Sequence, residues 1–464
     1  MVRTRIAPSP TGKDVHIGTV ATALMNWAYA KKNSGQFIIR IEDTDKSRLV
    51  EGGEEKMLKT LEAIGLKADE SPLVGGPYAP YRQSERLAIY KKYAEELVTK
   101  RKAYYCICKP ERLEEMRKKQ QAEKKVPKYD RHCFSRQDEV KQAIKNGEKY
   151  VIRLLIPDKE IVFTDLIRGQ IKIQGANLDD QVLLKSDGFP TYHLGVVIDD
   201  YLMKISHVIR GEEWLPSTPK HIVLYEAFGW ELPQYAHVSL LRNADKSKLS
   251  KRKNPVWASE YLSQGIFPEA LLNYLSLMGW SHPDGKEIFS LEEYVKVFNI
   301  KDIQKTAPVF DPIKLEWMNG EYIRKTQNSK LKAQIFEFYE KKYPGELIEK
   351  TVPLIKERIK KLSDYLPLCE FFFKAPLIYE VGLSGNKKLL KNIYDELKKI
   401  TEWKAGVIGE KMQDLAKKLG VKNNEFFMIL RVVVSGKKIS PPLNESMEIL
   451  GKEECVKRIN KLTR

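Results

Sequence analysis

The chain opens with RIAPSPTG at residues 5–12 and HIGT at residues 16–19, and these two stretches decide the fold of its first part. Residues 2–7 contain enough apolar side chains for a buried strand, which the prolines and the glycine that follow interrupt with a loop. A helical pattern continues over residues 19–32, and Gly35 is its expected end. The start of this helix is therefore a candidate binding site.

Phosphate is the ligand that such a site favours. A helix N-terminus presents unpaired N–H groups and the positive end of the helix dipole. Gly18 permits close approach of a nucleotide, and His16 can donate a hydrogen bond to a phosphate oxygen that gains charge in a phosphoryl or adenylyl transition state. The alternative is a capped surface helix with an incidental histidine.

A second stretch, KSKLSKRK at residues 246–253, carries five cations in eight residues. Lysine side chains on a loop can bind a triphosphate and stabilise its charge as pyrophosphate separates. Lys248 and Lys251 are the candidates for this stabilisation. The alternative is a solvated charge run or a nucleic-acid contact.

The composition indicates a polyanionic partner. The 464 residues include 80 lysines and arginines against 62 acidic residues, which gives a formal net charge of +18. The excess is concentrated, because residues 101–150 hold 15 basic and 8 acidic side chains and residues 331–464 hold 27 and 18. Clustered cations release counterions from phosphates. Ordinary solubility charge is the alternative, but it would hardly leave residues 151–330 near neutral.

Length and composition also limit the class of protein. A chain of this length predicts roughly three domains or more. We find no run of about 18 apolar residues and no signal or transit segment, so we expect a soluble intracellular protein without a membrane partner. Five cysteines in such a chain are not a disulfide framework.

The periodicity predicts an α/β fold followed by an all-α region. Residues 1–65 have the order β-α-β-α, which implies a parallel sheet with its ligands at the carboxyl ends of the strands. Further elements are expected as a strand at 36–42, helices near 49–64 and 84–126, strands at 150–157, 170–174 and 204–210, and a helix from Ser217 to Gly229. Towards the C-terminus we expect a capping box at Ser290 and Glu293, a helix that Asp311-Pro312 opens and Gly320 closes, and amphipathic helices from 330 onward.

The two opening stretches and KLSKR resemble the HIGH and KMSKS signatures of class I aminoacyl-tRNA synthetases, and the whole chain resembles bacterial-type glutamyl-tRNA synthetases. The further matches are FIIRIEDTD at 37–45, YRQSER at 81–86, LLKSDGFPTYHL at 183–194 and HVIRGEEWLPSTPKH at 207–221. The domains implied by the resemblance are a Rossmann-type catalytic domain at 1–85 and 192–243, an inserted acceptor-binding domain at 86–191, a stem-contact domain with the KLSKR loop at 244–327, and an all-α anticodon-binding region at 328–464.

The resemblance implies a glutamate–tRNA ligase of protein synthesis, which activates glutamate with ATP to glutamyl-adenylate and transfers it to the 3′ end of tRNA(Glu). Mg²⁺ is expected with the triphosphate, and activation in this family usually requires bound tRNA. The partners would be tRNA(Glu), L-glutamate and ATP, and we expect a cytoplasmic monomer.

By the same resemblance, the glutamate pocket consists of Arg5, Ser9, Glu42, Tyr192 and Arg210. The arginines can bind carboxylates bidentately, Tyr192 can hydrogen-bond the side-chain carboxylate, and Glu42 can hold the α-ammonium group. An arginine opposite the side-chain carboxylate would prefer glutamate to glutamine. Surface ion pairs are the alternative for the charged residues.

The nucleotide-binding residues implied are His16, Gly18, Gly211, Trp214, Lys248, Ser250 and Lys251. The two lysines, with His16 and Gly18, form the expected catalytic set, whereas Trp214 could equally be a core aromatic residue. Between Gly12 and His16 this chain has three residues, one more than the family usually has, which leaves the reach of His16 open.

Cys106-Ile107-Cys108 and Cys133, which follows after 24 intervening residues, have the character of a zinc site. Many glutamyl enzymes have a histidine where this chain has Ser135. Tyr129 and His132 are the candidates for the fourth ligand, and we favour Tyr129. Three reduced cysteines that bind no metal are the alternative.

Arg358 lies in VPLIKERIKKL at 352–362 and aligns with an arginine that in this family reads the third anticodon base. It favours an enzyme that discriminates against tRNA(Gln), although other arginines and phosphate contacts compete with it. Four alternatives stay open: a non-discriminating enzyme that also charges tRNA(Gln), a glutaminyl enzyme, a short glutamylating tRNA-modification enzyme, and a catalytically silent tRNA-binding paralogue. The helical C-terminal region opposes the second and third, and the paired lysines with His16 oppose the last.

Overall fold

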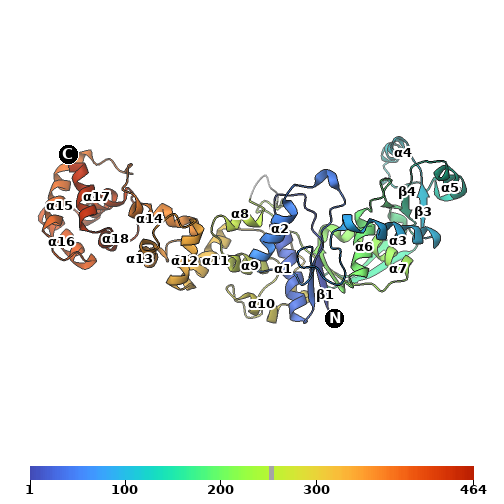
Figure 1. Cartoon of the computed structure of the whole chain (residues 1–464), viewed down its shortest axis with the longest axis horizontal. Helices are drawn as coiled ribbons and strands as arrows, with labels where there is room; N and C mark the ends of the chain where they lie inside the picture. Colours follow the sequence, from blue (N-terminus) through green and yellow to red (C-terminus); the bar gives the residue numbers. More distant parts are fainter. Residues whose placement is uncertain (250–254, 464) are drawn as a thin grey trace. The chain divides into compact units, whose positions relative to one another are not determined.

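The computed structural model describes residues 1–249 and 255–463. Internal contacts divide the chain into two compact units (Figure 1). Unit 1 consists of residues 1–261 and 271–311, and unit 2 consists of residues 262–270 and 312–464.

Unit 1 holds the strands of the described chain together with the first helices. The strands are β1 (Arg3–Ile6), β2 (Gln36–Ile39), β3 (Ala103–Cys106), β4 (Val151–Leu154), β5 (Glu160–Asp165), β6 (Gly169–Gln174), β7 (Val182–Leu184), β8 (His207–Gly211) and β9 (Gln234–Val238). The helices are α1 (Ile17–Lys32), α2 (Gly53–Ala63), α3 (Leu87–Thr99), α4 (Pro110–Ala122), α5 (Gln137–Lys145), α6 (Tyr192–Leu202), α7 (Thr218–Phe228) and α10 (Leu291–Val297), while α8 (Ala258–Leu262) and α9 (Pro268–Ser276) contribute residues to both units.

The predicted β-α-β-α start is confirmed, and its strands are parallel. β1 pairs with β2 from Arg3 opposite Gln36 to Ile6 opposite Ile39, and β8 pairs in parallel with β9. The carbonyl oxygen of Arg3 accepts a hydrogen bond from the N–H of Ser206, just before β8, which brings the two parallel pairs together. The carboxyl ends of these strands therefore face one region, as ligand sites in α/β folds do.

The sequence predicted one helical stretch over residues 84–126, and this is wrong. Strand β3 separates α3 from α4 and pairs antiparallel with β4, which pairs in turn with β7. The run AYYC of β3 has aromatic side chains that suit a pleated, half-buried surface, and tertiary pairing overrides the helical pattern on either side. Strand β5, which the sequence did not show, pairs with β6 and meets β9 at Asp165.

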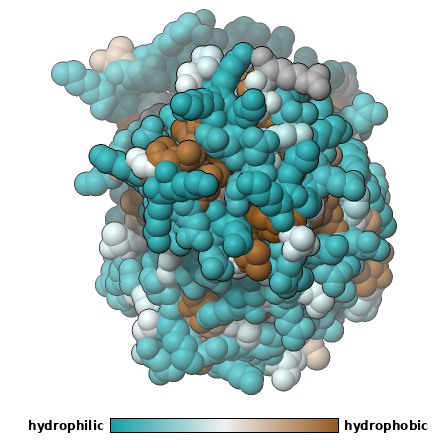
Figure 2. Space-filling model, turned by 90° about the vertical axis from the view of Figure 1, so that its left-hand side faces the viewer, coloured by the Kyte–Doolittle hydropathy of each residue, from teal (hydrophilic) through white to brown (hydrophobic). Residues whose placement is uncertain are grey.

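Unit 2 is all-α, as predicted. Its helices are α11 (Pro312–Lys325), α12 (Asn328–Phe338), α13 (Gly345–Ile355), α14 (Tyr365–Phe373), α15 (Lys387–Lys399), α16 (Ala405–Lys418), α17 (Asn423–Ser435), α18 (Leu443–Leu450) and α19 (Lys452–Thr463). Their apolar faces form one buried cluster that includes Val352, Ile393 and Leu430. The face of the molecule near α15 and α16 is largely hydrophilic, with small separate hydrophobic patches (Figure 2).

Two helix ends follow the sequence signals, and one does not. Gly229 ends α7 in the left-handed conformation, and the Ser290 hydroxyl accepts a hydrogen bond from the N–H of Glu293 at the start of α10. The expectation that Gly320 ends a helix is wrong, because α11 continues to Lys325. Gly320 is buried within α11, and the amide of the adjacent Asn319 bonds the backbone at Phe267 and Lys360, so tertiary contacts of the neighbouring residue hold the helix past the glycine.

Among the described residues, no helix combines the length and the apolar character needed to cross a membrane.

Candidate active site

A cavity of about 330 Å³ lies at the carboxyl ends of the parallel strands. It is lined by the residues after β1, the end of β8, the residues after β9, and the first turns of α1 and α6. The sequence-predicted residues among its lining are Arg5, His16, Gly18, Glu42, Tyr192, Arg210, Gly211, Trp214 and Lys248. Residues far apart in the sequence are thus brought to one site.

Arg210, at the end of β8, is held by neutral acceptors. Its Nη1 donates to Tyr192 Oη at 2.9 Å, its Nη2 to Thr218 Oγ1 at 2.8 Å, and its Nε to His237 Nε2 at 3.0 Å. Within the described part of the chain, no carboxylate lies at ion-pair distance from this guanidinium, although the residue is only 6% exposed. A buried cation without a counter-charge is costly, so the site favours an anionic ligand.

A hydrogen-bond chain through His237 to Asp165 fixes the orientation of the Arg210 guanidinium. His237 Nδ1 donates to Asp165 Oδ2 at 2.7 Å, which leaves Nε2 as the acceptor for Arg210. Burial lowers the pKa of His237 in spite of its hydrogen bond to Asp165, so the imidazole is neutral near pH 7. A neutral ring in this tautomer accepts from the guanidinium without repelling it.

Arg5 is held by a buried ion network. Its Nε and Nη2 donate to the two carboxylate oxygens of Asp200, each at 3.0 Å. Arg40, which is fully buried, donates to Asp200 at 2.9 Å and lies 3.4 Å from Asp199. Asp199 also accepts from Arg86 Nε at 2.7 Å, and Arg86 directly precedes α3. Burial alone would raise the pKa of Asp200, but Arg5 and Arg40 hold it below its ordinary value.

Glu42 lies at the edge of this network with incomplete pairing. Its Oε1 is 3.7 Å from Arg40 Nη2 and has no hydrogen-bond partner among the described residues. Burial raises the pKa of Glu42 to about 7, although Arg40 and Arg5 act in the opposite direction. A cationic ligand group would supply the missing partner.

His16 caps α1 and lines the cavity. Its Nδ1 accepts from the N–H of Gly18 at 3.0 Å, so the ring N–H is on Nε2. A Cβ at Gly18 would lie 3.2 Å from His16 Nδ1, closer than most side chains tolerate. The small residue therefore lets the histidine and the helix N-terminus share one site.

The other predicted nucleotide contacts lie around the same cavity. Trp214 is 38% exposed and packs on Tyr192 with ring centroids 4.2 Å apart, so it is not a core residue. Lys248 is exposed and lines the cavity, whereas Ser250 and Lys251 lie outside the described residues. Ser9 is exposed in the loop after β1 and does not line the cavity.

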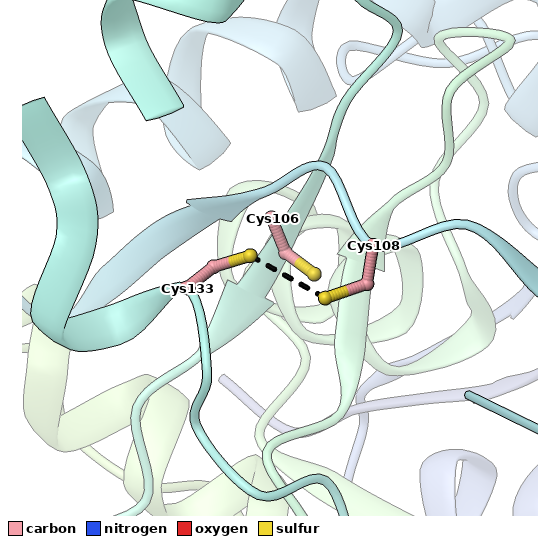
Figure 3. Close-up of side chains that lie close together, drawn as sticks. All are labelled: Cys106, Cys108 and Cys133. Atoms are coloured by element: carbon pink, nitrogen blue, oxygen red, sulfur yellow. Dashed lines mark hydrogen bonds between the residues drawn. The ribbon is translucent and has the colours of Figure 1, made fainter. Parts of the chain in front are cut away.

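A cysteine cluster lies around the end of β3. The sulfur atoms of Cys106, Cys108 and Cys133 lie within 4.8 Å of one another and point to a common centre (Figure 3). Tyr129 Oη lies 3.4 Å from Cys106 Sγ and 3.2 Å from Cys108 Sγ. His132 instead bonds Arg136 through Nε2 at 2.9 Å and is half-buried. The donor set thus has three sulfurs and one phenol oxygen, which fits a four-coordinate metal site.

Arg358 lies in unit 2, in the turn after α13. It is exposed, and its Nη1 donates to the carbonyl oxygen of Ser440 at 3.3 Å. Arg431 donates to the same carbonyl at 3.4 Å.

Several residues behind the cavity were not found from the sequence. Asp199 and Asp200 stand in the apolar run GVVIDDYL of α6, where two adjacent acidic residues were a usable sign of buried ion pairing. Asp165 and His237 gave no comparable sign, because each stands in an ordinary strand pattern.

Comparison with known proteins gives a consistent result. Residues 1–317 match the family model described as tRNA synthetases class I (E and Q), catalytic domain, and residues 321–463 match an anticodon binding domain. A glutamate–tRNA ligase of Dehalococcoides mccartyi is 44% identical over 475 residues, which cover 99% of this chain and 97% of that relative. One from Acidothermus cellulolyticus is 43% identical, covering 99% and 95%. The crystal structure of a glutamate tRNA ligase from Elizabethkingia meningosepticum in complex with its amino acid has a TM-score of 0.89 and 38% identity, with 100% of this chain and 99% of that chain covered.

Proposed function

The chain belongs to the class I glutamate–tRNA ligases, and from this premise we propose how its own residues bind glutamate, ATP and tRNA. The observation that carries the proposal is the buried Arg210, whose partners among the described residues are all neutral and which faces the same cavity as Glu42. A ligand with an anionic end and an ammonium group satisfies both residues. Glutamate has these groups.

Arg210 and Tyr192 bind the side-chain carboxylate of glutamate in this proposal. Glu42 accepts the α-ammonium group, and Arg5, oriented by Asp200, adds positive potential for a carboxylate. Glutamine lacks the charge that Arg210 requires, so binding it would leave the buried guanidinium without a counter-ion. The pocket therefore favours glutamate over glutamine. Ser9, which does not line the cavity, remains a predicted contact.

His16, Gly18, Gly211, Trp214 and Lys248 are the proposed nucleotide contacts among the described residues. The glutamate α-carboxylate attacks the α-phosphorus of ATP, and pyrophosphate leaves with its bond electrons. His16 donates from Nε2 to a phosphate oxygen, and Lys248 stabilises the charge on the departing pyrophosphate. Ser250 and Lys251 are proposed for the same site on sequence grounds, and Mg²⁺ is expected to accompany the triphosphate.

In the second step, the 3′-terminal hydroxyl of tRNA(Glu) attacks the carbonyl carbon of the mixed anhydride. The new ester forms, AMP leaves, and the hydroxyl proton goes to the phosphate oxygen or to water. The protein needs no side-chain nucleophile for either step, so its contribution is positioning and charge stabilisation.

The net charge of +18 and the match of unit 2 to an anticodon binding domain support tRNA as the large partner. We place the acceptor-binding insertion at 86–191, the stem-contact domain at 244–327 and the anticodon-binding region at 328–464. Arg358 is the proposed reader of the third anticodon base, and its exposure leaves it accessible. A cytoplasmic monomer is the form that we propose.

One zinc ion is proposed at Cys106, Cys108, Cys133 and Tyr129. The convergence of three sulfurs and the phenol oxygen supports this set over one that contains His132. When bound, the ion would tie the end of β3 to the segment before α5 and so stabilise the insertion.

Aminoacylation with labelled glutamate and ATP tests the proposal, with tRNA(Glu), tRNA(Gln) and no tRNA compared in parallel. Charging of tRNA(Glu) alone is the expected result. Charging of both tRNAs would show a non-discriminating enzyme and would overturn the role of Arg358. Tight tRNA binding without charging would leave the catalytically silent paralogue as the explanation.

A further inference from the structure

The loop before His16, which contains the additional residue, pairs with a segment that is distant in the sequence. Residues 15–17 pair antiparallel with residues 256–258, which follow the KLSKR stretch closely in the sequence, and His16 lies opposite Trp257. The N–H of Ile17 donates to Val256 O at 2.8 Å, and the N–H of Ala258 donates to Val15 O at 3.0 Å. The end of the loop is therefore held by backbone hydrogen bonds to residues 256–258.

Asp14 makes this contact with its side chain. Its Oδ2 accepts from the N–H of Ser259 at 3.1 Å, at the start of α8. The residue is 6% exposed, and its Oδ1 has no partner among the described residues. A carboxylate that is buried with one hydrogen bond is expensive, and an apolar residue would fill the space at lower cost. Packing alone does not explain this residue.

Trp257 packs against both opening stretches of the sequence, at Gly12 and at His16. A Cβ at Gly12 would come within 2.2 Å of the indole ring, so the ring covers the glycine directly. The indole meets the imidazole of His16 edge to face, with centroids 6.2 Å apart. Glu260 Oε2 accepts from the N–H groups of Val256 and Trp257, each at 3.0 Å, which fixes the segment that carries the indole.

We propose that Asp14 is a positioning residue for adenylate formation, and that with Trp257 it ties the loop of His16 to residues 255–260. We call the contacts of Asp14 and Trp257 between these two segments the tie, and it has two effects. It sets the entry of the chain into α1, and thereby the direction of His16, and it holds residues 255–260 against the loop before His16. Asp14 does not line the cavity, so its effect passes through His16.

This inference rests on the role proposed for His16 at the phosphates of ATP. If that role is correct, loosening the loop weakens a contact made in the transition state more than it weakens substrate binding. In the proposed pocket, glutamate binding depends on Arg210 and Glu42. The contacts described above for these two residues do not include Asp14 or Trp257.

The test is ATP–pyrophosphate exchange by the full-length protein, with glutamate and saturating tRNA(Glu), for wild type, Asp14→Ala, Asp14→Asn and Ser259→Ala. Asp14→Ala is expected to lower kcat about tenfold, the factor that corresponds to about 1.4 kcal/mol, with the KM for glutamate unchanged. Asp14→Asn retains an oxygen acceptor and should recover most of kcat. Ser259→Ala retains the backbone donor and should match wild type.

Thermal unfolding of each variant separates positioning from stability. A lower kcat in Asp14→Ala at an unchanged KM for glutamate, with rescue by Asp14→Asn, supports the tie. Wild-type kcat in Asp14→Ala, or a KM for glutamate that rises in parallel, overturns it. Absence of exchange by the wild-type protein would instead contradict the proposed function, so the two failures are distinguishable.

Discussion

Replacing Arg210 by lysine tests the glutamate pocket, because it keeps the charge and removes the planar fork. The guanidinium spans Tyr192, Thr218 and His237 with separate N–H groups, and a single ammonium group cannot reach all three. The lysine also makes one contact to the substrate carboxylate where arginine makes two. Loss of one hydrogen bond to a charged group costs about 1.5–3 kcal/mol.

That free energy predicts a fall in kcat/KM for glutamate of about 10- to 150-fold. The assay is aminoacylation of tRNA(Glu) over a range of glutamate concentrations, with ATP and tRNA saturating. Arg101→Lys, at an exposed arginine in the turn after α3, is the matched control and should match wild type. A kcat/KM for Arg210→Lys within about twofold of wild type would refute the assignment of Arg210, since it falls below the smallest loss expected from one such bond.

Three further predictions concern Glu42, the cysteine cluster and Arg358. Because burial raises the pKa of Glu42 to about 7 against the opposing effect of Arg40, its carboxyl is protonated below that pH and loses its attraction for the α-ammonium group. The KM for glutamate should therefore rise as the pH falls from 8 to 6, and a pH-independent KM would contradict this role. Cys133→Ser should lose the bound zinc, measured as metal content per purified protein, whereas Cys369→Ala, outside the cluster, should retain it. Arg358→Gln should raise the charging of tRNA(Gln) relative to tRNA(Glu) in paired aminoacylation assays, and an unchanged ratio would exclude Arg358 as the discriminating residue.

Hydrogen bonds and ion pairs connect the arginines of the pocket to residues elsewhere in unit 1. Asp199 joins the network of Arg5 and Arg40 to Arg86, at the start of the proposed insertion. Asp165, which orients His237 and through it Arg210, ends β5 and also belongs to the proposed insertion. Arg210 is therefore oriented, through His237, by a residue of the segment that we propose contacts the tRNA acceptor end, whereas Arg5 is held by Asp200 of α6.

Features that depend on residues close together in the sequence were predictable. The strand, loop and helix around His16 follow from a short apolar run, prolines and a helical period, and the structure confirms β1 and α1. The cysteine pair at 106–108 was likewise visible as a local pattern. The boundary errors arose where local signals were ambiguous, as at β3, where pairing with β4 decided the outcome.

The sequence by itself determined the class of fold, the family and many of the polar residues that line the cavity, because these depend on contiguous motifs whose chemistry is readable in order. Only the tertiary structure decided which residues support them. Arg5 meets Asp200 across 195 positions, and Asp14 meets Ser259 across 245. The physical reason is that hydrogen bonds and ion pairs depend on distance in space, and strand order sets that distance without leaving a periodic trace in the sequence.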